Sequence, residues 1–525
     1  MNRFCHLVYG CCLILSSCAP SERKADFTFL NGTEPESLDP AIITGQSEGR
    51  IISALFEGLT AHDPQACVVP GVAERWKISS DGKRYTFHLR SNAFWSNGDP
   101  LTARDFVDSW RRTLDPTTAS EYAYQLYYIR NAEAFNAGKL EDFSQVGVHA
   151  TDNHTLIVEL SNPTPFFIDL CGFPTLMPLH VKSIEKHGDN WIKPGNLISN
   201  GAYILEDWRI NHRIRLRANP HYWDRSHVDL QTVDILPTNK ANTAFNLYHS
   251  GAADLLLDKG LVPVMLLDSL RKRADFHTSP FLGNYFYRFN VTRKPFNDPR
   301  VRKAFAMATN KQRIVHEITR AGEQPADSLV PHGIPGYTPP QGLSYDPETA
   351  RKLLSEAGFP DGKGFPSIFL LFNSSDQNEA IATLIQDMLK KELSISVQLS
   401  QQEMKVYLNS MSRLDYDFCR ASWVGDYNDP NTFLDMFVTN GGNNRTGWSN
   451  AKYDSLIRMA AAELNPQKRM EIFQQAETIL CRDELPILPL YYYVGIQFYD
   501  AAKITGIHPN VLDDHPLKYI RRIKN

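Results

Sequence analysis

The spacing of apolar residues along the chain changes repeatedly between a period of two and a period of 3.6, which predicts a mixed α and β fold. Apolar and polar residues alternate at 27–29 and again at 85–90, as expected for strands. Residues 51–56 instead place apolar side chains on one face of a helix. Thr102 is a typical N-cap with Asp105 at the third helical position, and it begins a predicted helix with the apolar face Phe106, Val107, Trp110 and Leu114.

The second half of the chain shows alternating helices and strands more clearly. Asp-Pro pairs at 298–299 and 346–347 each put a capping acid before a proline at the first helical position. A buried strand at 367–372, an amphipathic helix at 379–393 and an alternating strand at 395–399 follow in that order. This order predicts a βαβ crossover, and therefore parallel strands.

Length and charge narrow the class of protein. At roughly 100 to 200 residues per domain, 525 residues allow two to four compact units. A late apolar, Tyr-rich run at 486–494 predicts a strand that returns the chain to an earlier sheet. The formal net charge of -4 is too balanced for a protein that binds nucleic-acid phosphates, so a general polyanion binder is excluded.

The first residues have the pattern of an export signal. Arg3 precedes a mostly apolar stretch at 4–15 and the small residues before Cys18, so residues 1–17 are predicted to be a secretory signal. The junction resembles a lipoprotein site, at which Cys18 is acylated and becomes the new N-terminus; the alternatives are an ordinary signal cleaved nearby or an uncleaved anchor. No later stretch reaches about 18 apolar residues. We therefore expect a body held to a membrane at one end, in the periplasm or at the cell surface.

The remaining cysteines show no metal-binding or disulfide framework. Cys67, Cys171, Cys419 and Cys481 are widely spaced, without a CxxC pair or a histidine at ligand spacing. Export permits a disulfide, but the spacing nominates none. Most of the four are expected to be small buried apolar residues.

Catalytic patterns are weak. Residues 45–49 match GxSxG, which would make Ser47 the nucleophile of a secreted hydrolase, but residues 40–44 are a poor strand for the turn that this chemistry needs. His316-Glu317 lacks the second histidine of a zinc protease, and no phosphate-binding, dinucleotide-binding or EF-hand motif is present. We expect no enzyme, no cofactor and no metal site, with the Ser47 hydrolase as the alternative from another class.

One loop carries an acid between aromatic residues. Asp426 lies within Trp423-Val424-Gly425-Asp426-Tyr427-Asn428-Asp429-Pro430, framed by glycine and turn residues. Such an acid could present a negative charge in a mostly apolar cleft, where it needs a cation because an unpaired buried charge is costly. A capping or turn acid is the alternative.

Ordered motifs across nearly the whole chain resemble a known family. They are Glu36-Ser37-Leu38-Asp39-Pro40, Leu55-Phe56-Glu57-Gly58-Leu59, Pro70-Gly71-Val72-Ala73-Glu74, Tyr85 to Arg90, Phe94-Trp95-Ser96-Asn97-Gly98, Asn200-Gly201-Ala202-Tyr203, Pro295-Phe296-Asn297-Asp298 and Ala421 to Pro430. This series is similar to family 5 of the bacterial extracellular solute-binding proteins, and within it to the oligopeptide-binding proteins of ABC importers.

The resemblance implies a two-lobed, periplasmic-binding-protein-like clamp with three domains. Domain I would be discontinuous, at 25–56, 182–281 and 495–525, domain II would be the insertion at 57–181, and domain III would be the second lobe at 282–494. The chain would be a monomer that encloses an oligopeptide by backbone pairing and delivers it to a permease and ATPase complex. Alternatives are a specialised ligand, such as a murein peptide, dipeptide or metal chelate, and a surface adhesin that reuses the clamp.

The resemblance also implies roles for individual residues. Asp426 would pair with the peptide α-ammonium, Trp423 would pack beside the ligand, and Arg420 would meet a peptide carboxylate. The other cleft positions would be Tyr122, Asn373, Tyr285, Phe286 and Tyr427. Ordinary packing is the alternative for Tyr122, Asn373, Tyr285 and Phe286.

Several positions depart from the family pattern. A cysteine pair of the family falls on Gly283 and Val424, so that disulfide cannot form here. A lysine and a histidine that meet the carboxylate of some peptides fall on Thr319 and Asn378, with Arg320 one residue further on. A cleft tryptophan and a cleft glutamate are replaced by Met404 and Thr44. The preferred peptide length or C-terminal chemistry is therefore expected to differ.

Overall fold

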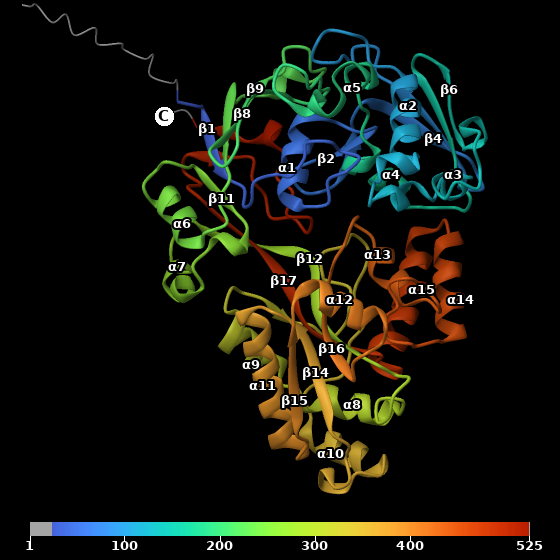
Figure 1. The fold of residues 1–525 in the computed structure, drawn as a ribbon, viewed down its shortest axis with the longest axis vertical. Coiled ribbons are helices and arrows are strands. Elements are labelled where there is room, and N and C mark those ends of the chain that lie inside the picture. The colour runs from blue at the N-terminus through green and yellow to red at the C-terminus, as the bar shows by residue number, and fades with distance from the viewer. Residues whose placement is uncertain (1–23, 524–525) are drawn as a thin grey trace, which may run out of the picture.

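The computed structural model describes residues 24–523 and shows two lobes stacked along the long axis of the molecule (Figure 1). The predicted signal at 1–17 and Cys18 lie outside the described residues. The fold is the mixed α and β arrangement predicted from the apolar pattern. Within 24–523, no helix is both long and apolar enough to cross a membrane.

The first lobe contains one half of the main sheet. Strand β1 pairs in parallel with β10 and β11, and all four of its residues are buried because both faces of the sheet are covered. The elements of this half are β1 (Phe27–Leu30), β8 (Tyr203–Arg209), β9 (Arg213–Ala218), β10 (Thr232–Leu236), β11 (Leu255–Leu257), α1 (Gln46–Leu55), α5 (Val181–His187), α6 (Ala241–His249) and α7 (Leu267–Leu270).

A second sheet lies in the same lobe and shares its apolar core. Its four antiparallel strands have the order β4-β5-β7-β6. Helix α2 confirms the predicted cap, because the Asp105 carboxylate accepts a 2.7 Å hydrogen bond from the backbone N–H of Thr102. The elements are β2 (Thr60–His62), β3 (Val68–Pro70), β4 (Ala73–Ile78), β5 (Arg84–Leu89), β6 (Val148–Asp152), β7 (Thr155–Glu159), α2 (Ala103–Leu114), α3 (Ala132–Asn136) and α4 (Phe167–Leu170).

The second lobe confirms the predicted βαβ unit, because β14 and β15 are parallel and α11 connects them. Asp298 and Asp346 cap α8 and α10 by accepting backbone hydrogen bonds of 2.9 and 3.1 Å. The elements are β13 (Gln324–Pro325), β14 (Ile368–Asn373), β15 (Val397–Gln402), β16 (Phe418–Val424), α8 (Pro299–Ala308), α9 (Lys311–Arg313), α10 (Pro347–Glu356), α11 (Asp376–Leu393), α12 (Met404–Ser412), α13 (Asn431–Leu434), α14 (Ala451–Ala462) and α15 (Pro466–Thr478).

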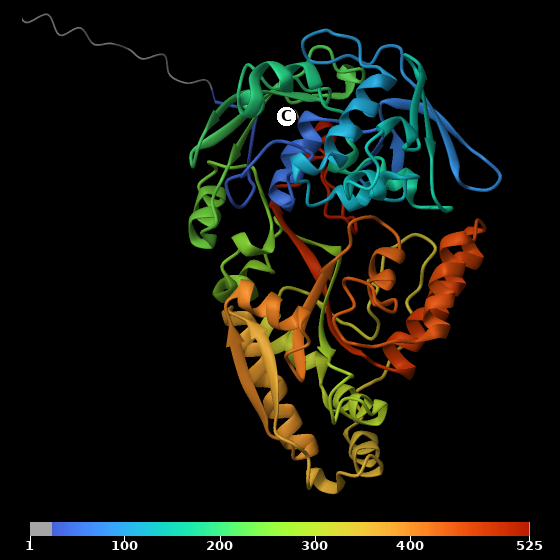
Figure 2. The same cartoon turned by 45° about the vertical axis from the view of Figure 1, so that its right-hand side comes forward.

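Two long strands, β12 (Phe276–Phe289) and β17 (Ile487–Tyr499), run from one lobe into the other (Figures 1 and 2). Their antiparallel pairing is irregular between Pro280 and Asn284, and its register shifts again between Tyr285 and Phe286. Strand β17 begins near the predicted position and extends five residues beyond Val494, where it pairs with β11 of the first lobe. The predicted return to an earlier sheet is therefore confirmed, and one sheet runs through both lobes. The chain ends in a small pair, β18 (Ile504–Thr505) and β19 (Arg521–Arg522).

The four cysteines of the described residues are free. Cys171, Cys419 and Cys481 are buried, as predicted, whereas Cys67 is exposed. Burial raises the pKa of the three buried thiols, so they stay protonated and behave as small apolar side chains.

Candidate ligand-binding cleft between the lobes

A cavity of about 340 Å³ lies between the lobes. The first lobe lines it with residues between Ile43 and Ser53, around the start of α1, and with Tyr122 and residues 172–174. Residues 424–426 line it from the second lobe, and residues 512–514 come from the C-terminal segment. Segments that are distant in sequence thus converge on one cavity.

Asp426 lies in the loop after β16, and backbone contacts fix its position. The preceding residue, Gly425, donates its N–H to the carbonyl oxygen of Leu282 on β12 at 2.8 Å. The N–H of Asp426 itself donates to the hydroxyl oxygen of Thr432 at 3.1 Å. The loop therefore continues from the main sheet and holds the carboxylate at the cavity.

The charge of Asp426 has no counter-charge in the described part of the chain. Its side-chain hydrogen-bond partner is neutral, the hydroxyl of Tyr124, which donates to Oδ2 at 3.3 Å. Burial raises the pKa of Asp426 to about 6, and its contacts with the neutral side chains of Tyr124 and Gln125 oppose the shift only in part. The site can therefore accept a cation that enters from outside.

The second acid of the same loop is already neutralised. Asp429 forms a two-pronged ion pair with Arg469, in which Oδ1 lies 2.8 Å from Nη2, and both side chains are buried. Asp429 also accepts a hydrogen bond of 2.9 Å from the N–H of Asn431. Asp429 therefore acts as a turn acid of this loop.

Aromatic residues of the loop reach the first lobe. The ring of Tyr427 stacks on Phe166 with centroids 4.3 Å apart and an interplanar angle of 6°, and it joins the apolar core of the first lobe. Trp423 lines a smaller cavity of about 180 Å³ that also borders Asp426. Tyr122 lines the larger cavity and stacks on Tyr124 at 5.5 Å. The structure therefore brings these aromatic residues together around Asp426.

The remaining predicted residues lie deeper in the second lobe. The guanidinium of Arg420 lies 4.8 Å from the ring centroid of Tyr285, whose hydroxyl donates to Asn378 at 3.0 Å. Asn378 in turn donates to the side-chain oxygen of Asn373 at 3.0 Å. Phe286 is fully buried in the core of this lobe, where it packs as sequence analysis allowed. Neither Phe286 nor Tyr285 lines the two cavities that border Asp426.

The two positions of the missing cysteine pair face each other. Gly283 on β12 is directly paired with Val424 on β16. A Cβ atom at Gly283 would lie 2.4 Å from the ring of Tyr493, so this ring occupies the space that a side chain would need. The ring of Tyr493 therefore fills the space beside Gly283.

Apart from Thr44, the other residues that depart from the family pattern contact residues outside the two cavities or are exposed. Thr319 is buried and donates its hydroxyl to Glu323 at 2.8 Å, and Arg320 forms an ion pair with Asp268 of the first lobe. Thr44 lines the larger cavity, whereas Met404 is 46% exposed on α12. Arg320 is therefore not a free substitute for the missing lysine.

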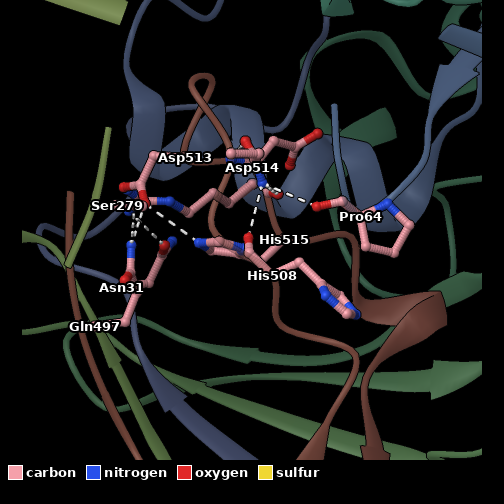
Figure 3. Close-up of polar contacts among 10 residues, drawn as sticks. Asn31, Pro64, Ser279, Gln497, His508, Asp513, Asp514 and His515 are labelled. Atoms are coloured by element: carbon pink, nitrogen blue, oxygen red, sulfur yellow. Dashed lines mark hydrogen bonds and ion pairs between the residues drawn. The ribbon is translucent and has the colours of Figure 1, made fainter. Parts of the chain in front are cut away.

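Sequence analysis did not identify the C-terminal segment as part of the cleft. Figure 3 shows that Ser279 and Gln497, from the two connecting strands, point toward Asp513, and both hydrogen-bond to its carboxylate. His515 lies 3.2 Å and Arg50 of α1 lies 3.8 Å from the same carboxylate. These partners come from three distant segments and form no motif, so no local signal could have revealed them.

The backbone also requires a glycine at this contact. A Cβ atom at Gly495 of β17 would lie 2.5 Å from Asp513 Oδ1 and 2.7 Å from the hydroxyl oxygen of Ser279. The glycine therefore allows the C-terminal segment to approach the connecting strands.

Ser47 lacks the geometry of a hydrolase nucleophile. Residues 40–44 form no strand, so the strand-to-helix turn that this chemistry needs is absent from this described segment. The Ser47 hydroxyl donates to Glu48 at 3.0 Å. Among the described residues, no group of three or more acids, histidines or cysteines could hold a metal ion.

Comparisons with known proteins agree with this architecture. A profile of the bacterial extracellular solute-binding proteins, family 5, middle region, matches residues 67–445. The chain is 39% identical to the periplasmic oligopeptide-binding protein OppA of Salmonella typhimurium, over 94% of this chain and 92% of that protein.

Comparisons with solved structures also agree with this architecture. The unliganded open form of the periplasmic murein tripeptide-binding protein MppA superposes with a TM-score of 0.84 at 36% identity, over 95% of this chain and 97% of that one. Haemophilus influenzae OppA in complex with the peptide RPPGFSPFR superposes with a TM-score of 0.77 at 32% identity, over 95% and 100% of the two chains.

Proposed function

The chain belongs to family 5 of the bacterial extracellular solute-binding proteins, and we propose that it is the peptide-binding subunit of an ABC importer. The names of its relatives support an oligopeptide as the ligand. The peptide would lie between the lobes, with its backbone paired to exposed strand edges and its side chains in hydrated pockets.

The observation that carries this proposal is the unpaired Asp426 carboxylate at the cavity between the lobes. The α-ammonium of a peptide supplies the missing positive charge and can donate up to three hydrogen bonds. Arg420 would meet the C-terminal carboxylate, and Trp423 would pack against the first residues of the peptide. The cleft would thus recognise the two ends of the peptide and make few specific contacts to most of its side chains.

Ligand enclosure would require the lobes to rotate about the connecting strands. The irregular pairing between Pro280 and Asn284 is suited to such a hinge, because the strands there are not held by a continuous hydrogen-bond ladder. Closure would be the signal to the permease. We further propose the domain boundaries 25–56, 182–281 and 495–525 for domain I, 57–181 for domain II and 282–494 for domain III, and acylation of Cys18 as the membrane anchor.

Titration calorimetry with Ala-Ala-Ala and its N-acetylated form tests the proposal. We expect N-acetylation to reduce the affinity of the wild type at least about a hundredfold, because it removes the charge that Asp426 would bind. Asp426→Asn should weaken binding of the free peptide, whereas Asp415→Asn, at an exposed ion pair of the same lobe, should not. Equal binding of both peptides by the wild type would contradict the anchor, and absence of binding across a panel of lengths would contradict the peptide ligand.

A murein peptide is the second candidate. The structural match to the murein tripeptide-binding protein favours it, and so do the replaced residues around the family's carboxylate site. Native mass spectrometry of protein purified without added ligand separates the two candidates, because a murein peptide has a fixed mass and a general peptide pool does not.

A further inference from the structure

The smaller cavity beside Asp426 contains a second acid. Asp435, which follows α13, lines this volume of about 180 Å³ together with Asp426. Its carboxylate accepts one hydrogen bond, of 3.1 Å, from the side-chain amide of Asn431. None of the residues that line the cavity is cationic, and the nearby Arg469 is committed to Asp429. Two carboxylates therefore share a small volume without a positive charge from the described residues.

The pKa of Asp435 is consistent with two carboxylates that share a cavity without a positive charge from residues 24–523. Burial raises its pKa to about 7, and repulsion from Asp426 and Asp429 adds to the shift. The aromatic groups of Tyr128 and Tyr427 also face it, but their own pKa values are raised well above the neutral range by burial. The carboxylates are thus the groups in this cavity that titrate near neutral pH.

A buried amide lines the cavity beside the two acids. Gln125 is 1% exposed, and neither its side-chain oxygen nor its nitrogen makes a hydrogen bond of normal geometry to a described residue, although the amide lies near enough to Asp426 to lower the pKa of that acid. A buried amide without partners costs free energy, so a polar occupant is expected. The rings of Tyr124, Tyr128 and Trp423 offer aromatic surface that suits a cation.

We propose that this cavity binds a second cationic group of the ligand, the ammonium or guanidinium of a basic first residue, next to the α-ammonium held by Asp426. This inference rests on the proposed peptide-binding function. The side-chain cation would donate to Asp435 and to the amide oxygen of Gln125, while the aliphatic part of the side chain would pack on the aromatic walls. The protein would then prefer peptides that begin with lysine or arginine.

Calorimetry with Lys-Ala-Ala and norleucine-Ala-Ala tests the preference, because the two peptides differ at the end of one side chain. We expect the wild type to bind the lysine peptide about tenfold more tightly. Asp435→Asn should abolish this difference, whereas Asp415→Asn should keep it. Equal affinities in the wild type, with both peptides bound, would overturn the inference and leave the proposed function intact. Failure to bind either peptide would overturn both.

A measurement on the wild type alone tests the inference even if Asp435→Asn does not fold. Binding a cation to Asp435 lowers its pKa, so the protein should release more protons with the lysine peptide than with the norleucine peptide at pH 6.5. Calorimetry in phosphate and in Tris, which differ in ionisation enthalpy, measures this difference. Equal proton release for the two peptides would overturn the inference.

Discussion

The hydroxyl of Tyr124 donates a hydrogen bond of 3.3 Å to the carboxylate of Asp426, across the gap between the two lobes. Tyr124 belongs to the first lobe and Asp426 to the second, 302 residues further along the chain. A neutral hydroxyl satisfies a carboxylate only in part, because it supplies no charge. The ligand-free cleft therefore retains an electrostatic cost that a bound cation would remove.

Asp426→Asn should stabilise the ligand-free protein. Because the pKa of Asp426 is raised to about 6, the folded state binds the proton more tightly than the unfolded state does. The wild type therefore loses stability as pH rises from about 4 to about 6, and the loss is complete above that range. At pH 8 the variant should be about 2 kcal/mol more stable, a value reduced for partial exposure of the carboxylate.

Urea unfolding of both proteins at pH 4 and pH 8, without ligand, measures this difference. The gain in stability should be present at pH 8 and nearly absent at pH 4, where both side chains are neutral in the folded state. A variant that is less stable than the wild type at pH 8 would show that Asp426 already has a stabilising partner.

Peptide affinity should depend on pH through the same group. An α-ammonium binds the ionised carboxylate, so a proton competes with it below the pKa of about 6. For an all-alanine peptide the affinity should be highest above pH 7 and fall about tenfold per pH unit below pH 6. Asp426→Asn should bind weakly and without this dependence. A wild-type affinity that rises on acidification would contradict the charge pairing.

Arg420→Gln should alter recognition of the peptide carboxylate. The Arg420 guanidinium lies over Tyr285, and its Nε atom is buried without a hydrogen-bond partner in the described chain. For the wild type, C-terminal amidation of a peptide should reduce affinity about tenfold, and Arg420→Gln should bind both forms alike. Arg458→Gln, at an exposed position of α14, is the matched control. If amidation still weakens binding to Arg420→Gln, another cation meets the carboxylate.

Local chemistry in the sequence predicted several of the elements. The cap at Thr102 and the prolines after Asp298 and Asp346 act within one helical turn, so their signals survive in any tertiary context. The order of strand, helix and strand between 367 and 399 likewise leaves little choice of topology. These elements lie where the spacing predicted them.

Contacts between segments that are distant in the sequence could not be predicted from local chemistry. Gln125 and Asp435 border one cavity although 310 positions separate them, and neither belongs to a motif. Asp513 reaches Arg50 only because the chain returns to the first lobe after β17. Apolar spacing defines the buried face of an element but not the partner that covers it, so the electrostatics of the cleft emerge only from the assembled fold.

Asp429→Asn should show that Asp429 has a structural role in the loop, in contrast to the binding role proposed for Asp426. Arg469 is 3% exposed, and the substitution leaves its charge without a counter-ion in the interior, which should cost about 3 to 5 kcal/mol of unfolding free energy. Replacing both partners, as in Asp429→Asn with Arg469→Met, should recover much of this loss because no buried charge remains. Asp483→Asn, in a pair that is half exposed, should change stability by less than about 1 kcal/mol.

Urea unfolding of the four proteins provides the comparison, and calorimetry with Ala-Ala-Ala extends it to function. Because Asp429 fixes the turn that follows Asp426, the single variant should also lose peptide affinity, and the double variant should regain part of it. If the double variant is as unstable as the single one, then the cost lies in the lost hydrogen bond from Asn431 rather than in the uncompensated arginine.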